Sequence, residues 1–161
     1  MIVVTDTSVI LNLCLLGQES LLASLFGTVH APPSVRSEFQ RLATVDLRFI
    51  GLAFPSFIRV TPVTQPLPVV MQNQRLHAGE REALSLAVEM GAQAILMDER
   101  AGRFAAASLG LRCVGILGIL LRAKATNLLP AIKPLLDQLH HQARFWIAPG
   151  LRQQILNAAG E

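Results

Sequence analysis

Acidic residues are scarce in this 161-residue chain, and two of them stand where a carboxylate can do chemistry. Asp6 follows the apolar run at residues 2–4, and Asp98 follows another at residues 94–97. Continuous apolar runs rich in β-branched residues are typical of strands buried on both faces. Each aspartate is therefore expected at the carboxyl end of a parallel strand, the edge at which open α/β sheets bind their ligands.

Two glutamates are expected to reach the same edge. Glu38 lies in the second turn of an expected helix, and Glu80 lies near the start of another. In a βα architecture the helix N-termini point to the edge where the strands end, so four acids from distant segments would share a small volume. Like charges at short range oppose one another's ionisation. A hard divalent cation, Mg²⁺ or Mn²⁺, relieves that repulsion and can promote displacement at phosphorus.

The elements that position these acids alternate between strand and helix, which favours parallel strands joined by helical crossovers. Thr7 or Ser8 is expected to cap the first helix. Residues 44–57 are ambiguous between helix and loop, residues 62–76 form a connector with a helical turn near 69–74, and residues 145–147 form a short extended or edge segment. Expected strands cover 2–4, 28–31, 58–60, 94–97 and 112–114; expected helices cover 9–16, 19–26, 34–42, 79–90, 101–109, 116–124, 129–139 and 149–158. We predict a single α/β domain, a three-layer α/β/α sandwich around a central parallel sheet of four or five strands.

The composition limits the class of protein. The chain is 52% hydrophobic and only 16% charged, whereas an average domain has about 25% charged residues. This apolar excess favours a compact core and a homodimer. No apolar run reaches the roughly 20 residues of a membrane span, and no secretory leader is expected, so we predict a cytoplasmic protein without a membrane segment. Cys14 and Cys113 lie in apolar contexts and are expected to be buried free thiols.

Four segments, in this order, resemble PIN-domain proteins: VVTDTSVILNL, PPSVRSEF, GEREALSLA and ILMDERAGR. That family comprises metal-dependent ribonucleases and includes the VapC-type toxins. The resemblance covers about residues 1–120, with a helical extension over about 125–161. The run VGILGILLRAKA strengthens a likeness to a prokaryotic PIN-like subgroup of predicted nucleic-acid-binding proteins. The resemblance implies the strand order 3-2-1-4-5.

The resemblance also implies a catalytic set. Asp6, Glu38, Glu80 and Asp98 match the family's acidic positions. Asp6, Glu80 and Asp98 would hold Mg²⁺ or Mn²⁺, and Glu38 would complete the site or orient the attacking water. Many relatives have aspartate at the third position, where this chain has glutamate.

Secondary candidates accompany this set. Ser8 matches the hydroxyl residue that follows the first acid, and Glu99 is a candidate for an outer position. Glu82 is the second choice for the third acid; residues two apart on a helix do not share a face, so Glu80 and Glu82 are not expected to act together. Arg103 is expected to pair with an acid or to contact phosphate.

The implied function is a metal-dependent endoribonuclease that cuts RNA, with a toxin–antitoxin role that would add a small antitoxin protein as a partner. Two alternatives stay open: a non-catalytic PIN-like module that binds nucleic acid or protein, and a phosphatase or DNA nuclease with the same site. Each residue also has a purely structural interpretation. Asp6 alone would cap a helix, His77 would be a surface or capping residue, and Trp146 would serve packing or an oligomer contact.

Overall fold

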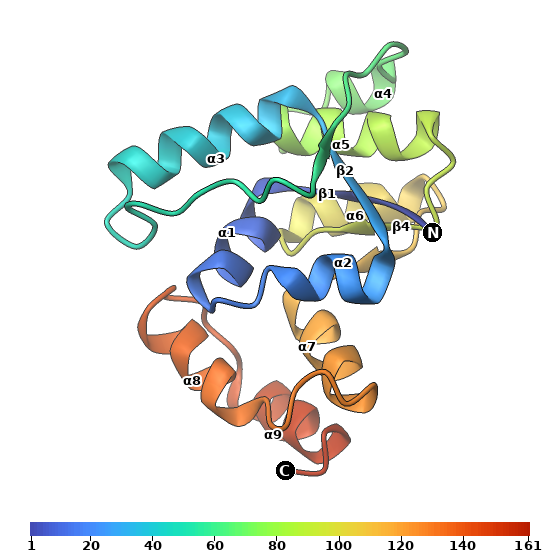
Figure 1. Ribbon diagram of the computed structural model, residues 1–161. Coiled ribbons are helices and arrows are strands. Elements are labelled where there is room, and N and C mark those ends of the chain that lie inside the picture. Colours follow the sequence, from blue (N-terminus) through green and yellow to red (C-terminus); the bar gives the residue numbers. More distant parts are fainter.

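Five parallel strands form the centre of the computed structural model, which describes residues 1–161 (Figure 1). Their order across the sheet is β3-β2-β1-β4-β5, which confirms the expected order, and the central strand is the first one in the chain. Val4 of that strand lies opposite His30 on one side and Ile95 on the other. The strands are β1 (Ile2–Thr5), β2 (Thr28–Ala31), β3 (Arg59–Val60), β4 (Ala94–Leu96) and β5 (Cys113–Val114).

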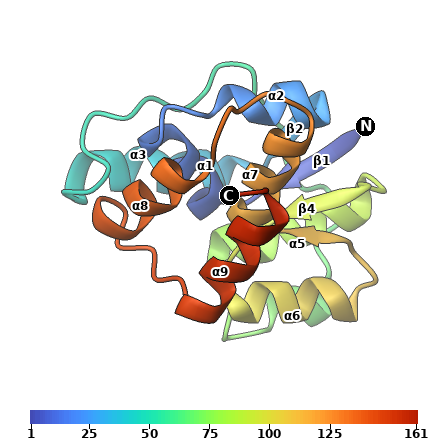
Figure 2. The same ribbon diagram turned by 90° about the horizontal axis from the view of Figure 1, so that it is seen from below.

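Helices cover both faces of the sheet, which confirms the three-layer α/β/α sandwich. One side carries α1, α2 and α7, with α8 and α9 beyond them, as Figure 1 and the view from below in Figure 2 show. On the other side α4, α5 and α6 pack over the sheet, and α3 runs beside α5. The helices are α1 (Thr7–Leu15), α2 (Ser20–Phe26), α3 (Pro33–Val45), α4 (Pro68–Met71), α5 (Ala78–Glu89), α6 (Arg100–Ser108), α7 (Ile116–Ala125), α8 (Lys133–His141) and α9 (Pro149–Ala158).

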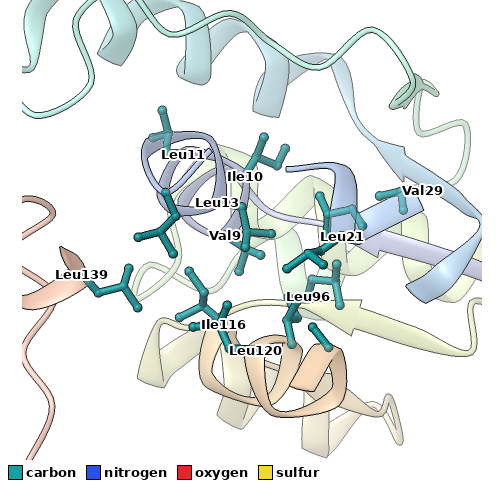
Figure 3. Close-up of a cluster of buried hydrophobic side chains, with 14 of the residues drawn as sticks. Val9, Ile10, Leu11, Leu13, Leu21, Val29, Leu96, Ile116, Leu120 and Leu139 are labelled. Carbon is teal, nitrogen blue, oxygen red and sulfur yellow. The ribbon is translucent and has the colours of Figure 1, made fainter. Parts of the chain in front are cut away.

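The apolar runs of the strands feed two separate cores. Successive side chains of a strand point to opposite faces, so Val3 joins a cluster of 28 buried residues and Val4 joins one of 11. The larger cluster gathers α1, α2, α7 and α8 against β4 around Leu96 (Figure 3). Each large aliphatic side chain buried there contributes about 1.5–3 kcal/mol. Burial on both faces explains why the strands are apolar throughout and do not alternate.

Several local expectations are corrected. The cap of α1 is Asp6, not Thr7 or Ser8, because the Asp6 carboxylate accepts a hydrogen bond from the Val9 amide. Residues 47–51 form turns, which decides the open choice between helix and loop there in favour of the loop. Helix α8 begins at Lys133, later than expected, with Pro134 in its first turn. Both cysteines are free, but they are half-buried and not fully buried.

Of the two expectations for residues 145–147, an extended or an edge segment, the edge segment is wrong, because the sheet ends at β3 and β5. Phe145 and Ile147 instead pack against the larger core cluster. The Phe145 amide donates to the Leu139 carbonyl, 3.0 Å away, and so ties the segment to the end of α8.

No single helix is long and apolar enough to cross a membrane. Helices α1 and α2 meet that test only together, as a pair bent by 118°.

Candidate active site

The ends of β1 and β4 bring two aspartates to one edge of the sheet. The Asp6 amide donates to the Leu96 carbonyl at 3.0 Å, which ties the end of β1 to the end of β4. Asp98 follows two residues later. Both carboxylates line a cleft of about 380 Å³, and Ser8, Glu38, His77 and Glu99 are among the other residues that line it.

Asp6 is buried at the start of α1, with only 2% of its surface exposed. Its carboxylate accepts hydrogen bonds from the Val9 amide at 3.1 Å and from the Ser8 hydroxyl at 3.2 and 3.3 Å. Burial raises the pKa of Asp6 well above its ordinary value, and the charges of Asp98 and Glu80 raise it further. Asp6 is therefore both a helix cap and a carboxylate whose charged form is disfavoured where it lies.

Asp98 is held by the first turn of α7. Its two oxygens accept from the Ile116 amide at 3.1 and 3.3 Å. Burial raises the pKa of Asp98 to about 6, although the Ile116 hydrogen bond and the positive charge of Arg103 act in the opposite direction. The Arg103 guanidinium donates to the Met97 carbonyl at 3.1 Å. The secondary candidate Arg103 thus lies beside Asp98, and Glu99 is exposed where it borders the cleft.

Glu80 is buried behind His77. One Glu80 oxygen lies 2.5 Å from His77 Nε2, and the other, Oε2, is buried without a hydrogen-bond partner. On its other side the His77 ring reaches Glu38, with 3.7 Å between Nδ1 and Oε2. Burial raises the pKa of Glu80, while His77 acts to lower it. His77 therefore lies between the two glutamates and separates Glu80 from the cleft, which Glu80 does not line.

The prediction that His77 is a surface or capping residue is confirmed, because it stands at the N-cap of α5 with 56% of its side chain exposed. Its contacts with Glu80 and Glu38 were not predicted. The signal in the sequence is its spacing, three residues before Glu80, because the side chains of an N-cap and of the third helical residue meet. Its contact with Glu38 depends on the packing of α3 against α5 and has no such signal.

Glycines let the helices approach these carboxylates. A Cβ atom at Gly102 would lie 2.9 Å from Glu80 Oε2, and a Cβ at Gly79 would lie 2.9 Å from Glu38 Oε2. At Gly115 a Cβ would lie 2.7 Å from the Arg103 guanidinium and would also contact the Asp98 carboxylate. Any larger residue at these positions would displace an acid or its neighbour. The glycines therefore belong to the site, although the sequence prediction did not include them.

A family model described as the PIN domain matches residues 2–161. The chain belongs to the PIN-domain family. The match extends through α8 and α9, beyond the motifs that carry the resemblance. A search of curated proteins and a search of solved structures each found no match.

PIN domains are in general nucleases, and this PIN domain has carboxylates suited to Mg²⁺ or Mn²⁺. The buried oxygen of Glu80 has no partner, and burial disfavours the charged forms of Asp6, Glu80 and Asp98. A bound cation would give the Glu80 oxygen a partner and would favour the charged forms of the three acids. However, no set of three His, Cys, Asp or Glu side chains is arranged to hold one ion. The carboxylate donors fit the metal chemically, although they do not converge on a single point in this structure.

The structure also distinguishes between the two candidates for the third acid. Glu80 is close enough to Asp6 for its charge to raise the pKa of that aspartate. Glu82 lies two residues further along α5, is half-buried, and is not among the charges that raise the pKa of Asp6. The PIN-domain resemblance and the geometry therefore agree in favouring Glu80, while the catalytic role of all four acids stays a prediction.

Proposed function

We propose that this PIN-domain protein is a Mg²⁺- or Mn²⁺-dependent endoribonuclease that uses Asp6, Glu80 and Asp98 to hold the metal. One observation carries the proposal. Asp6 and Glu80 are buried and Asp98 is half-buried; these carboxyl groups come from three separate segments near the cleft, and burial together with neighbouring negative charge raises the pKa of each. Clusters of this kind are typical of functional sites, because a stability-optimised interior does not gather like charges.

The residues around the acids have separate tasks in this proposal. Ser8 and the Val9 amide hold the Asp6 carboxylate, and the start of α7 holds Asp98. Glu38 lines the cleft and would accept the proton of the attacking water. Arg103 is kept beside Asp98 by its hydrogen bond to Met97. When bound, the metal would supply Lewis-acid stabilisation of the charge that develops on the phosphate oxygens.

The test measures cleavage of a labelled RNA pool with Mn²⁺, with EDTA, and with Asp6→Asn. Asparagine keeps an oxygen that accepts from the Val9 amide, so the cap of α1 survives while the charge is lost. We expect Mn²⁺-dependent cleavage by the wild type and a loss of about 100-fold or more in the variant, the scale of removing one charge-stabilising group. Equal cleavage by wild type and Asp6→Asn would overturn the proposal. Single-stranded DNA and a simple phosphomonoester, assayed in parallel, separate RNA cleavage from DNA cleavage and phosphatase activity.

The rival is a non-catalytic PIN-like module, and one observation favours it. His77 covers Glu80, so no three ligands converge on one point. Such a module would bind RNA without cutting it under any metal condition, which the same assay detects. A toxin role would further require a small antitoxin protein as a partner, and a short open reading frame beside the gene would support that part of the proposal. Formation of a homodimer is a separate expectation, which light scattering can measure.

A further inference from the structure

Residues 143–147 lie between α8 and α9, and residues 143–146 line the same cleft as Asp6 and Asp98. This segment alternates between buried and exposed side chains. Ala143 and Ile147 are buried, at 2% and 8% exposure, and Phe145 packs against the larger core. Arg144 and Trp146 between them are exposed, and both line the cleft that contains Asp6 and Asp98. Ala143, Phe145 and Ile147 therefore anchor the segment on the core, and Arg144 and Trp146 expose their side chains at the cleft.

A second set of contacts fixes the segment in position. The Arg48 guanidinium donates to the Ala143 carbonyl at 3.1 Å and to Asp46 at 2.7 Å, and it lies 4.7 Å from the centre of the Phe49 ring. The backbone of Arg144 is left-handed, with φ of 53°. That conformation costs a residue other than glycine about 1 kcal/mol or more, and such strain concentrates at functional sites.

The two exposed side chains suit a nucleic acid strand. Trp146 keeps 72% of its surface exposed, although a large aromatic ring gains free energy when it is covered. No ion pair of the chain includes Arg144. Aromatic side chains stack on unpaired bases, and arginines bind the phosphates between them. The cleft volume of about 380 Å³ lies within the range of small-ligand sites.

We propose that Arg144 and Trp146 form a nucleotide subsite, in which the indole stacks on one unpaired base and the guanidinium binds a neighbouring phosphate. The subsite rests on the proposed nuclease function, because it would hold the strand whose backbone is cut at the acids. It restricts the substrate to single-stranded nucleic acid, since a base within a duplex offers no free face. Trp146 therefore acts in binding, which differs from the packing or oligomer contact expected from the sequence.

The test measures binding in EDTA, so that the strand is not cleaved during the measurement. The probe is a labelled single strand of about 12 nucleotides, a length that covers a typical single-strand site. We expect Trp146→Ala to weaken its binding about 10- to 100-fold, and Trp146→Phe to recover most of the affinity. Phe104→Ala is the matched control, because Phe104 is 75% exposed on α6 and does not line the cleft. The affinity of this variant for the strand should stay within about twofold of that of the wild type.

Two further measurements separate stacking from charge. Trp146 is the only tryptophan, and the chain has no tyrosine. Its emission should therefore be quenched as the strand saturates the protein. A strand of abasic residues keeps the phosphates but lacks the bases, so wild type and Trp146→Ala should bind it equally. Parallel ribose and deoxyribose strands show whether the subsite prefers RNA.

Equal affinity of wild type and Trp146→Ala for the normal strand would overturn the subsite. So would emission that changes with protein concentration but not with added strand, because Trp146 would then lie in a contact between two copies. Binding as expected, with no Mn²⁺-dependent cleavage, would reject the nuclease function and retain the subsite. Cleavage that is lost in Asp6→Asn, together with equal strand binding by wild type and Trp146→Ala, would retain the nuclease function and reject the subsite.

Discussion

The carboxylates at the strand edge differ from those on the outer helices and loops. At the edge, burial raises the pKa of Asp6 and Asp98. On the outside, hydrogen bonds from Arg48 lower the pKa of Asp46 to about 2, and backbone amides of residues 132 and 133 lower that of Glu161. The same chemical group is thus disfavoured as an anion in one region and favoured in the other.

The difference lies in how each region satisfies its charge. Glu161 accepts from the amides of Ile132 and Lys133 at 2.8 and 3.1 Å, which joins the C-terminus to the start of α8. Its charge stabilises the fold. At the strand edge Glu80 keeps one buried oxygen without a partner, so the charge there opposes folding. Such a cost supports the proposal that the charge there serves metal binding.

The largest expected effect comes from two glutamates on the same helix. Glu80→Gln should reduce Mn²⁺-dependent cleavage about 100-fold or more, because it removes a charge from the acid cluster. Glu82→Gln should leave cleavage within about twofold of the wild type, because Glu82 is half-buried two residues away and is not among the charges that act on Asp6. Initial rates under identical Mn²⁺ concentrations decide between them. If Glu82→Gln lost cleavage while Glu80→Gln kept it, Glu82 would be the third acid of the site. The contrast between the strand edge and the outer region would then be wrong.

An intermediate effect is expected on the stability of the metal-free protein. The pKa of Asp98 rises from 3.8 to about 6 on folding, so its protonation favours the folded state below about pH 4, and that contribution is lost as pH rises through 6. In EDTA near pH 7.5, Asp98→Asn should raise the free energy of unfolding by about 1–3 kcal/mol, after allowance for its partial exposure. Near pH 4 the difference should nearly vanish. Urea unfolding at both pH values measures it; a variant less stable near pH 7.5 would show that the Asp98 charge supports the fold.

The smallest effect is expected in the outer region. Asp137 accepts from Arg152 at 2.6 Å across α8 and α9, but half of its side-chain surface is exposed. Asp137→Asn should lower the free energy of unfolding by less than about 1 kcal/mol, because water screens exposed ion pairs. Thermal melts at low and at high salt measure the change, which should shrink as salt rises. If Asp137→Asn lowered the free energy of unfolding by as much as Asp98→Asn is expected to raise it, the contrast between the two regions would not hold.

Much of the architecture follows from local patterns in the sequence. Apolar runs such as residues 94–97 are long enough for strands and end in polar residues, and the glycine after α5 stops that helix. The strand order comes from the family resemblance, not from periodicity. The sequence left residues 145–147 open between an extended segment and a sheet edge, because a short aromatic segment looks the same whether it extends a sheet or covers a cleft; only the position of α8 and α9 decides.

The sequence alone determined that Asp6, Glu80 and Asp98 stand at the ends of strands or the starts of helices, because those positions depend on local apolar pattern and capping. Tertiary structure decided everything that depends on neighbours distant in the chain. It brought Glu38 of α3 to His77, packed Gly102 against Glu80, and brought Arg144 and Trp146 to the cleft that Asp6 and Asp98 line. These contacts join segments tens of residues apart, and their geometry is fixed by how helices pack on the sheet, which no short pattern encodes.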